Sequence, residues 1–380
     1  MEVKIDEAKK LIKLYVDKKR PFFLEGAPGI GKSQIFRQVA KDKAKELSLE
    51  YEECMVNIKV NYDTKTASIS MNKEYKNPEK YFFFLDVRIS SLDPSDIRGI
   101  PFPEGMNVTW LTPNWLPNMG SGIIFADEIN MAAPSIQASF YQLILDRKVG
   151  DYALPDNWCI MSAGNGEQDG CPVYPMGNAL NNRFSHARLI PPSSESWTEW
   201  AIENNKSMDI ISFINFKPTL LFKIEKNNKE RAFPTPRTIT LASDMIEGVK
   251  DQNFIHQIVA SCVGEGFATE FSAFLKLKNK ININDILANP KKVLDITEPG
   301  LLHTLMGGLA EKYKSQEKPA DRKKMMDKIL IVIGQKDFNE DFGVLLLKLM
   351  KMFDKNNFGK DLIASSEWSK ISSKYTRFLL

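Results

Sequence analysis

Residues 22–33 read Phe-Phe-Leu-Glu-Gly-Ala-Pro-Gly-Ile-Gly-Lys-Ser, a short apolar run that leads into a glycine-rich turn. From Gly26 to Ser33 the spacing is GxxxxGK[ST], which is typical of a loop that binds phosphate groups. Glycine lets the backbone follow a tight path close to a ligand, so that the N–H groups of the loop point at one phosphate cluster. We therefore expect a nucleotide-binding α/β unit in which a buried strand at 22–24 precedes the loop and a helix at 34–47 follows it.

Two side chains of this loop have specific expected roles. Lys32 is expected to reach the β- and γ-phosphates of ATP, and the Ser33 hydroxyl is expected to bind Mg²⁺. A glycine-rich turn without a ligand could have the same letters, but a strand before the loop and a helix after it are the context that a phosphate site needs. The residues predicted to bind the cofactor are Gly26, Ala27, Pro28, Gly29, Ile30, Gly31, Lys32, Ser33 and Gln34.

A second apolar run ends in two acidic residues, in Ile-Ile-Phe-Ala-Asp-Glu at 123–128. Asp127 would hold the metal through its water shell, and Glu128 would polarise the attacking water as a general base. An acidic pair after a strand is often only a loop cap, but downstream of a phosphate loop the hydrolytic interpretation is the stronger one. No NKxD segment follows the phosphate loop, so specificity for guanine is disfavoured.

Three further polar residues are candidates for the same site. Asn165 follows a predicted strand at 158–162 and could orient the attacking water or the γ-phosphate, although asparagine at a turn is common. Arg183 lies in Ala-Leu-Asn-Asn-Arg-Phe-Ser-His, and Arg237 lies in Pro-Thr-Pro-Arg-Thr. A planar guanidinium donates two hydrogen bonds to phosphate oxygens, which an ammonium group does not. A surface arginine paired with a nearby acid is the alternative for each, and Arg188 is the second choice for the role of Arg183.

Apolar runs and helical periodicity alternate before residue 190. Strands separated by helices indicate a parallel sheet with helices on both faces. The predicted elements are a helix at 1–20, the strand at 22–24, the helix at 34–47, a hairpin at 54–75, strands at 81–85, 122–126 and 158–162, and a helix at 134–145.

The character of the sequence changes after Pro191 and Pro192, where helical periodicity takes over, so we predict a boundary near residue 190. A lysine-rich stretch at 312–328 is interpreted as a solvated helix face rather than a nucleic-acid contact. Helices are predicted at 193–205, 207–216, 236–249, 253–277, 299–315, 320–334 and 339–353.

The composition is that of an ordinary globular protein. Of 380 residues, 43% are hydrophobic and 26% are charged, and 51 Lys and Arg against 48 Asp and Glu give a net charge of +3. A nucleic-acid-binding domain usually has a larger and clustered excess of positive charge, so composition gives that function little support.

The cysteines and the apolar runs indicate in which cellular compartment the protein is expected. Cys54, Cys159, Cys171 and Cys262 are far apart and accompanied by only three histidines, so we expect reduced thiols rather than a zinc site. The first residues lack the apolar core of a signal peptide, and no run of about 18 apolar residues occurs. These features predict a cytoplasmic protein without membrane insertion.

Several of these segments together resemble the MoxR-like (dynein-related) branch of the AAA+ ATPases. They occur in the same order as in that family and extend from about residue 20 to about residue 275. The matching segments are LEGAPGIGKSQ, LDVRISSLDPSDIRGIP, GIIFADEINMAAPSIQASFYQLILDRKVGDYALPDNWCIMSAGN, ALNNRFSHARL, ESWTEWA, FPTPRT and VGEGFATEFSAF.

The resemblance implies an α/β fold with a P-loop AAA+ core, a parallel sheet flanked by helices, a helical lid and a helical C-terminal region. The implied domains are a core at 1–190 with a helix-2-type insert near 100–118, a lid at 191–290 and an extension at 291–380. The implied roles are Walker A for Lys32 and Ser33, Walker B for Asp127 and Glu128, sensor 1 for Asn165, an arginine finger for Arg183 and sensor 2 for Arg237.

The resemblance also implies assembly into a ring, usually a hexamer, that hydrolyses ATP with Mg²⁺ and remodels a partner protein in the manner of a chaperone. Partners in that branch often carry a von Willebrand factor A domain, and the insert is a loop or hairpin that faces the central pore. The chain departs from the family at Met131, where a basic residue is frequent, and at 51–80, which is longer than usual.

Two other functions remain open at this point. One is a nucleic-acid-stimulated motor or loader coupled to a nuclease, which DNA-stimulated hydrolysis would indicate. The other is a scaffold that binds ATP but hardly hydrolyses it, and the presence of Glu128 argues against it.

Overall fold

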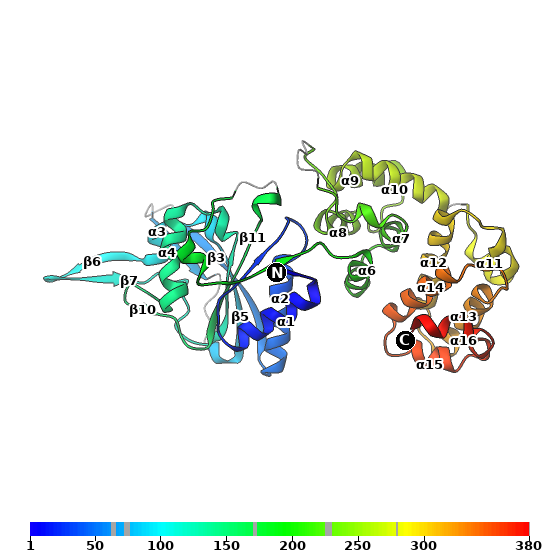
Figure 1. Ribbon diagram of the computed structural model, residues 1–380, viewed down its shortest axis with the longest axis horizontal. Helices are drawn as coiled ribbons and strands as arrows, with labels where there is room; N and C mark the ends of the chain where they lie inside the picture. Colours follow the sequence, from blue (N-terminus) through cyan, green and yellow to red (C-terminus); the bar gives the residue numbers. More distant parts are fainter. Residues whose placement is uncertain (62–65, 72–76, 170–172, 225–229, 279, 380) are drawn as a thin grey trace. The chain divides into compact units, whose positions relative to one another are not determined.

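The computed structural model describes residues 1–61, 66–71, 77–169, 173–224, 230–278 and 280–379. It divides the chain into two compact units, Met1–Pro191 and Pro192–Leu380. The first unit is built on a β-sheet and the second consists of helices (Figure 1).

An eight-stranded sheet forms the centre of the first unit. Every neighbouring pair in it is parallel except the last, β3 and β4, which pair antiparallel. In spatial order the strands are β1 (Glu2–Val3), β12 (Ser185–Leu189), β2 (Phe22–Glu25), β11 (Trp158–Gly164), β8 (Ser121–Asp127), β5 (Tyr81–Arg88), β3 (Glu50–Asn61) and β4 (Thr66–Met71).

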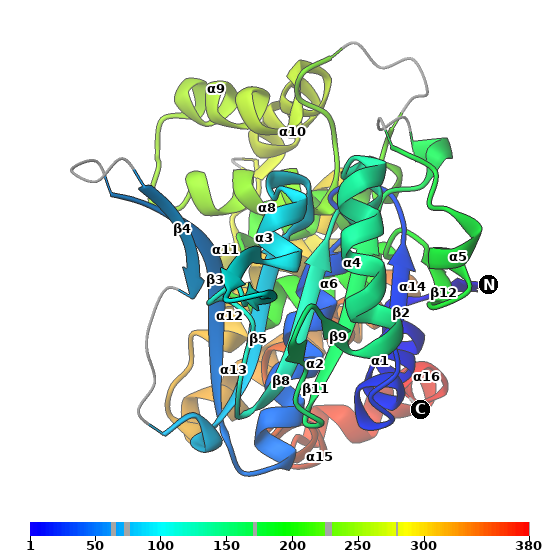
Figure 2. The same cartoon turned by 90° about the vertical axis from the view of Figure 1, so that its left-hand side faces the viewer.

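Helices cover both faces of this sheet, because its central strands are apolar on both sides. On one face α2 (Lys32–Glu46) packs its Phe36 ring 4.8 Å from the Phe125 ring, and α1 (Ile5–Asp17) lies against α2. On the other face α4 (Pro134–Asp146) contributes Phe140 to the cluster that contains Ile124, and α3 (Pro94–Arg98) lies beside α4. Figure 2 shows α2 and α4 on opposite sides of the strands.

This architecture confirms the expected α/β fold class, a largely parallel sheet flanked by helices and followed by a helical region. The predicted strands at 22–24, 81–85, 122–126 and 158–162 are β2, β5, β8 and β11. The hairpin predicted at 54–75 corresponds to β3 and β4, although residues 62–65 and 72–75 of that range lie outside the described residues.

Two small hairpins extend from the core. The strands β6 (Ile100–Glu104) and β7 (Asn107–Leu111) pair antiparallel and project from the unit (Figure 1). Their turn contains Gly105 at φ 61°, a left-handed conformation that favours glycine. The second hairpin joins β9 (Lys148–Val149) to β10 (Tyr152–Ala153). The two hairpins meet where the Trp110 N–H donates to Asp151 Oδ2 at 3.0 Å.

Two element predictions were wrong in part. Residues 1–20 do not form one helix, because Glu2–Val3 pairs as a strand with β12 before α1 begins. The single helix predicted at 253–277 is divided into α9 (Gln252–Val263) and α10 (Glu265–Lys278). Gly264 separates them at φ 104°, where a Cβ atom would lie 2.7 Å from the carbonyl oxygen of Ala232.

One hydrophobic core runs through the whole second unit, from Trp197 to Tyr375. Helix α12 (Pro299–Lys314) lies at its centre in contact with α7 (Met208–Phe216), α10 and α14 (Glu340–Phe353). In the described residues of either unit, no helix is both long and apolar enough to cross a bilayer. The remaining helices are α6 (Ser194–Glu203), α8 (Pro236–Met245), α11 (Ile283–Ala288), α13 (Pro319–Ile333), α15 (Phe358–Ile363) and α16 (Ser366–Leu379), with α5 (Asn178–Asn181) in the first unit.

Candidate functional site

The glycine-rich loop connects β2 to α2 at the carboxyl end of the parallel strands. Gly29 and Gly31 have φ values of 78° and 97°, which side chains with a Cβ atom rarely adopt. Gly31 occupies the N-cap position of α2, where no side chain accepts a hydrogen bond from the first turn. The backbone N–H groups of that turn are therefore available to an anion, as a phosphate site requires.

Lys32 is buried and its ammonium group faces the loop. Its Nζ donates to the carbonyl oxygens of Gly26 at 2.6 Å and Ala27 at 2.9 Å, and to Asn165 Oδ1 at 2.9 Å. The lysine thus lies between the loop and the end of β11, with its charge held beside the backbone that would surround a phosphate group. Gln34, in contrast, is exposed on α2.

The hydroxyl of Ser33 lies against the end of β8. Ser33 Oγ donates to Asp127 Oδ2 at 3.0 Å, so the two predicted metal ligands are adjacent. A hydroxyl and one carboxylate fit Mg²⁺, which takes few protein oxygens and completes its shell with water and substrate phosphates. Within the described ranges no group of three or more His, Cys, Asp and Glu side chains could hold a metal ion.

Glu128, the next residue, has a left-handed backbone with φ 57° and ψ 36°. This conformation is costly for a residue with a side chain and is kept only where the surroundings hold it. Here the Glu128 carbonyl accepts from the Met131 N–H at 2.8 Å, and its own N–H donates to Asp127 Oδ1 at 3.1 Å. The bend turns the chain sharply at the strand end and leaves the Glu128 side chain half-buried.

Asn165 is buried at the end of β11 and is held by residues that follow Glu128. Asn130 Nδ2 donates to the Asn165 carbonyl oxygen at 2.6 Å, and Asn165 Nδ2 lies 3.7 Å from Met131 Sδ. Met131, where the chain departs from the basic residue that is frequent in the resembling family, thus contacts Asn165 in its own chain. The role of Asn130 was missed, because an asparagine after an acidic pair has no distinctive spacing.

The three candidate arginines differ in their surroundings. Arg183 is exposed, and its Nη2 lies 3.4 Å from the hydroxyl of Tyr141 on α4. Arg188 is engaged by Glu25 and Asp169 in the same chain. Arg237 is exposed in the first turn of α8 and belongs to the second unit, so its role as sensor 2 stays a prediction.

Arg37 joins two carboxylates next to the site, a cluster that the sequence did not indicate. Its Nε donates to Glu53 Oε1 and its Nη2 donates to Asp86 Oδ2, both at 2.6 Å. The other oxygen of Asp86 is buried without a hydrogen-bond partner among the described residues. Burial raises the pKa of Asp86 to about 6 against the opposing charge of Arg37, and the nearby Asp127 carboxylate adds to the rise.

The Asp86→Asn variant is expected to remove a pH dependence of stability between about pH 4 and pH 6. An Asp in an unfolded chain titrates near about 3.9, so the higher pKa in the folded state stabilises the protein at low pH, and this contribution is lost as pH rises through 6. The difference between the two pKa values limits this contribution to the free energy of unfolding to at most about 3 kcal/mol. Urea unfolding of both proteins across this range measures it, and parallel curves would contradict it.

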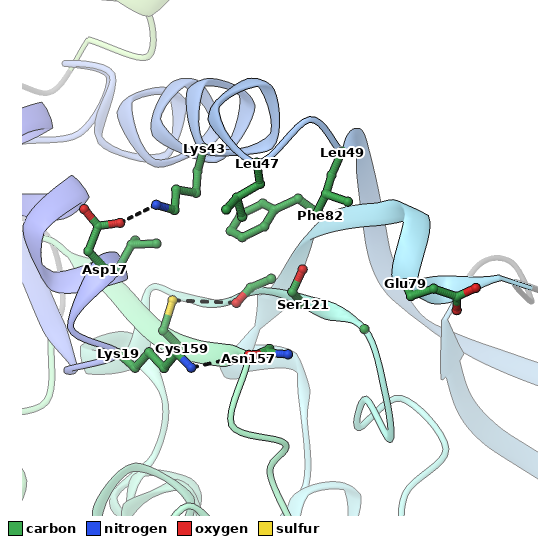
Figure 3. A pocket seen from close by; sticks show the side chains of 13 residues that line it. Asp17, Lys19, Lys43, Leu47, Leu49, Glu79, Phe82, Ser121, Asn157 and Cys159 are labelled. Atoms are coloured by element: carbon green, nitrogen blue, oxygen red, sulfur yellow. Dashed lines mark hydrogen bonds and ion pairs between the residues drawn. The ribbon is translucent and has the colours of Figure 1, made fainter.

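A pocket of about 530 Å³ lies at the opposite edge of the sheet, at the amino ends of β5, β8 and β11 (Figure 3). Lys43 is paired with Asp17 at 2.6 Å, and Cys159 Sγ donates to the Gly122 carbonyl oxygen at 3.6 Å. Burial raises the pKa of Cys159 to about 12, so its thiol is not a nucleophile near neutral pH. The paired groups in this pocket give no sign of a ligand.

No disulfide bond joins Cys54, Cys159 and Cys262, and Cys171 lies outside the described residues.

No protein-family model matches the chain, and no curated protein matches its sequence. Solved structures resemble the chain only at low similarity. The ORC2 protein of Aeropyrum pernix is 10% identical with a TM-score of 0.35, over 90% of this chain and 83% of that chain. NtrX from Brucella abortus in complex with ATP is 10% identical with a TM-score of 0.33, over 99% and 68%. A candidate ATPase from Cytophaga hutchinsonii is 13% identical with a TM-score of 0.31, over 91% and 81%. At these values the likenesses carry no argument about function.

Proposed function

We propose that the protein is an ATPase of the MoxR type, which binds ATP with Mg²⁺ and uses its hydrolysis to remodel or activate a partner protein. One observation carries the nucleotide site: the Ser33–Asp127 and Lys32–Asn165 hydrogen bonds bring together the glycine-rich loop and the ends of two strands. Groups that bind phosphate, hold a metal ion and orient water are needed together for phosphoryl transfer, and they meet here.

Each side chain has a task that follows from its chemistry. Bound ATP would supply the phosphoanhydride bond, and Mg²⁺ held by Ser33 and Asp127 would neutralise charge on its oxygens. Lys32 would exchange some of its present acceptors for oxygens of the β- and γ-phosphates, and Asn165 would orient the water or the γ-phosphate. Glu128 accepts a proton from that water, and its bent backbone supports this role because strain of this kind is common at active sites.

The exposed hairpin of β6 and β7 supports a protein as the partner. Side chains alternate across a hairpin, so Pro101 and Pro103 share one face with Val108 and Trp110 opposite them. Val108 is 61% exposed on this wholly apolar face. Apolar surface of this kind marks sites of protein contact, in keeping with a pore-facing insert at 100–118.

The position of Arg183 supports our proposal that the subunits assemble into a ring. Its guanidinium is exposed and pairs with no acid among the described residues, as a finger for a neighbouring subunit requires. As the family resemblance implies, we further propose a homo-hexamer and a partner protein with a von Willebrand factor A domain. In the second unit we propose a lid at 191–290, which contributes Arg237, and an extension at 291–380. The nucleic-acid motor is not favoured, and addition of duplex DNA should leave the hydrolysis rate unchanged.

The Lys32→Ala variant is expected to bind ATP at least about 10-fold more weakly than the unchanged protein. Hydrogen bonds to charged groups contribute about 1.5–3 kcal/mol each, and 1.4 kcal/mol corresponds to a factor of ten in affinity. Calorimetric titration with ATP and Mg²⁺ measures the change, with Lys45→Ala, an exposed lysine on the same helix, as the control. Equal affinity of Lys32→Ala and the unchanged protein would refute this nucleotide site.

A further inference from the structure

Arg188 and two carboxylates form an ion-paired cluster beside the phosphate-binding loop. Arg188 lies on β12, directly opposite Glu25 at the end of β2. Its Nη1 donates to Glu25 Oε1, and its Nη2 donates to Asp169 Oδ1 at 2.7 Å. Because Glu25 immediately precedes Gly26, this end of the cluster is attached to the start of the loop.

The other end of the cluster holds the segment that carries Asn165. Asp169 Oδ2 accepts from the Gly166 N–H at 2.8 Å, which closes a turn directly after Asn165. A Cβ atom at Gly166 would overlap with the side chains of Arg188, Glu25 and Asp169. Glycine at this position therefore lets the turn pack directly against the cluster.

The cluster is shielded from water most at Asp169. The side chain of Asp169 is 8% exposed, that of Arg188 is 23% exposed and that of Glu25 is 34% exposed. The rigid guanidinium fork fixes two carboxylates in one geometry, which a single ammonium group does not. An arginine finger must extend toward a neighbouring subunit, whereas the donors of Arg188 are used within its own chain.

We propose that Arg188 is a positioning residue of the hydrolytic site in its own subunit, where it fixes the turn that carries Asn165 against the phosphate-binding loop. The inference rests on the proposed ATPase function. It separates Arg188 from Arg183, since one acts on the site of its own chain and the other on the site of a neighbour.

The first test compares Arg188→Met with the unchanged protein. We expect kcat to fall by about 10–100-fold, because groups that hold a reacting residue in place typically contribute this much. The ATP dissociation constant should change by less than about threefold, because the loop and Lys32 remain. Amide hydrogen exchange at 165–169 should become faster.

Two further variants keep this test decisive. Asp169→Asn preserves the side-chain shape and should likewise lower kcat with little change in the ATP dissociation constant. It tests the inference even if Arg188→Met does not fold. Arg322→Met removes an ion pair with Asp361, at 2.6 Å, in the second unit and should keep kcat unchanged. Unchanged kcat in both Arg188→Met and Asp169→Asn, or an equal loss in Arg322→Met, would overturn the inference.

Mixed assemblies distinguish action within a subunit from action between subunits. Arg188→Met should restore hydrolysis when mixed with Arg183→Ala. The Arg188→Met subunit supplies Arg183, and the neighbouring Arg183→Ala subunit has an intact hydrolytic site. Arg188→Met should not restore hydrolysis when mixed with Lys32→Ala, because no intact site is present. Recovery of hydrolysis with Lys32→Ala would overturn the inference, whereas no recovery with Arg183→Ala would count against the proposed role of Arg183. An unchanged protein that binds ATP without hydrolysing it would instead overturn the proposed function.

Discussion

ATP hydrolysis by the Glu128→Gln variant is expected to be about 10²–10⁴-fold slower than that of the unchanged protein, which is the usual contribution of a general base. The amide keeps the size of the side chain but no longer accepts a proton from water. ATP binding should be nearly unchanged, because the loop, Lys32 and the Ser33–Asp127 pair are not altered. The variant should therefore hold ATP without converting it.

Single-turnover hydrolysis and equilibrium binding, measured side by side, test this expectation. The Glu46→Gln variant is a matched control, since it makes the same chemical change at an exposed carboxylate at the end of α2. Hydrolysis by Glu128→Gln at the unchanged rate would show that another group accepts the proton. Loss of ATP binding in the same variant would show that Glu128 holds the ligand instead.

The central strands could be predicted because each is an apolar run bounded by turn residues, and burial on both faces of a parallel sheet demands such a run. The short strands β1 and β12 could not be predicted from the sequence. Glu2 and Arg188 interrupt their apolar runs, and their pairing depends on partners far along the chain. The break between α9 and α10 was missed for a similar reason. It depends on the contact of Gly264 with Ala232, which helical periodicity does not reveal.

In the candidate site, too, local sequence patterns could be recognised, whereas contacts between distant residues could not. The glycine-rich loop and the Asp127–Glu128 pair are local patterns, so their spacing was sufficient to find them. The residues that hold the site are joined by contacts between distant segments: Arg188 and Glu25 are 163 positions apart, and Arg37 and Asp86 are 49 positions apart. One sequence contains no signal for such pairs, because each member resembles an ordinary surface charge.

The Arg183→Ala variant is expected to bind ATP nearly normally and to hydrolyse it about 10³–10⁵-fold more slowly, the range for arginine fingers supplied by a neighbouring chain. This corresponds to about 4–7 kcal/mol of transition-state stabilisation. The exposed guanidinium beside Tyr141 could be removed with little effect on the fold, because it is not part of the buried core. Tyr141→Phe keeps the ring under the guanidinium and removes only its hydroxyl, so it serves as the matched control with a much smaller loss.

Mixing two inactive variants tests whether Arg183 acts between subunits. Lys32→Ala lacks a working site but keeps Arg183, whereas Arg183→Ala keeps the site but lacks the finger. Some interfaces in the mixture combine an intact site with an intact finger, so hydrolysis should return, below the unchanged rate because the other interfaces remain defective. Native mass measurement with a slowly hydrolysed ATP analogue establishes that the two variants assemble and exchange subunits. If they exchange and the mixture stays inactive, Arg183 either acts on its own site or works only in a ring whose sites are all intact.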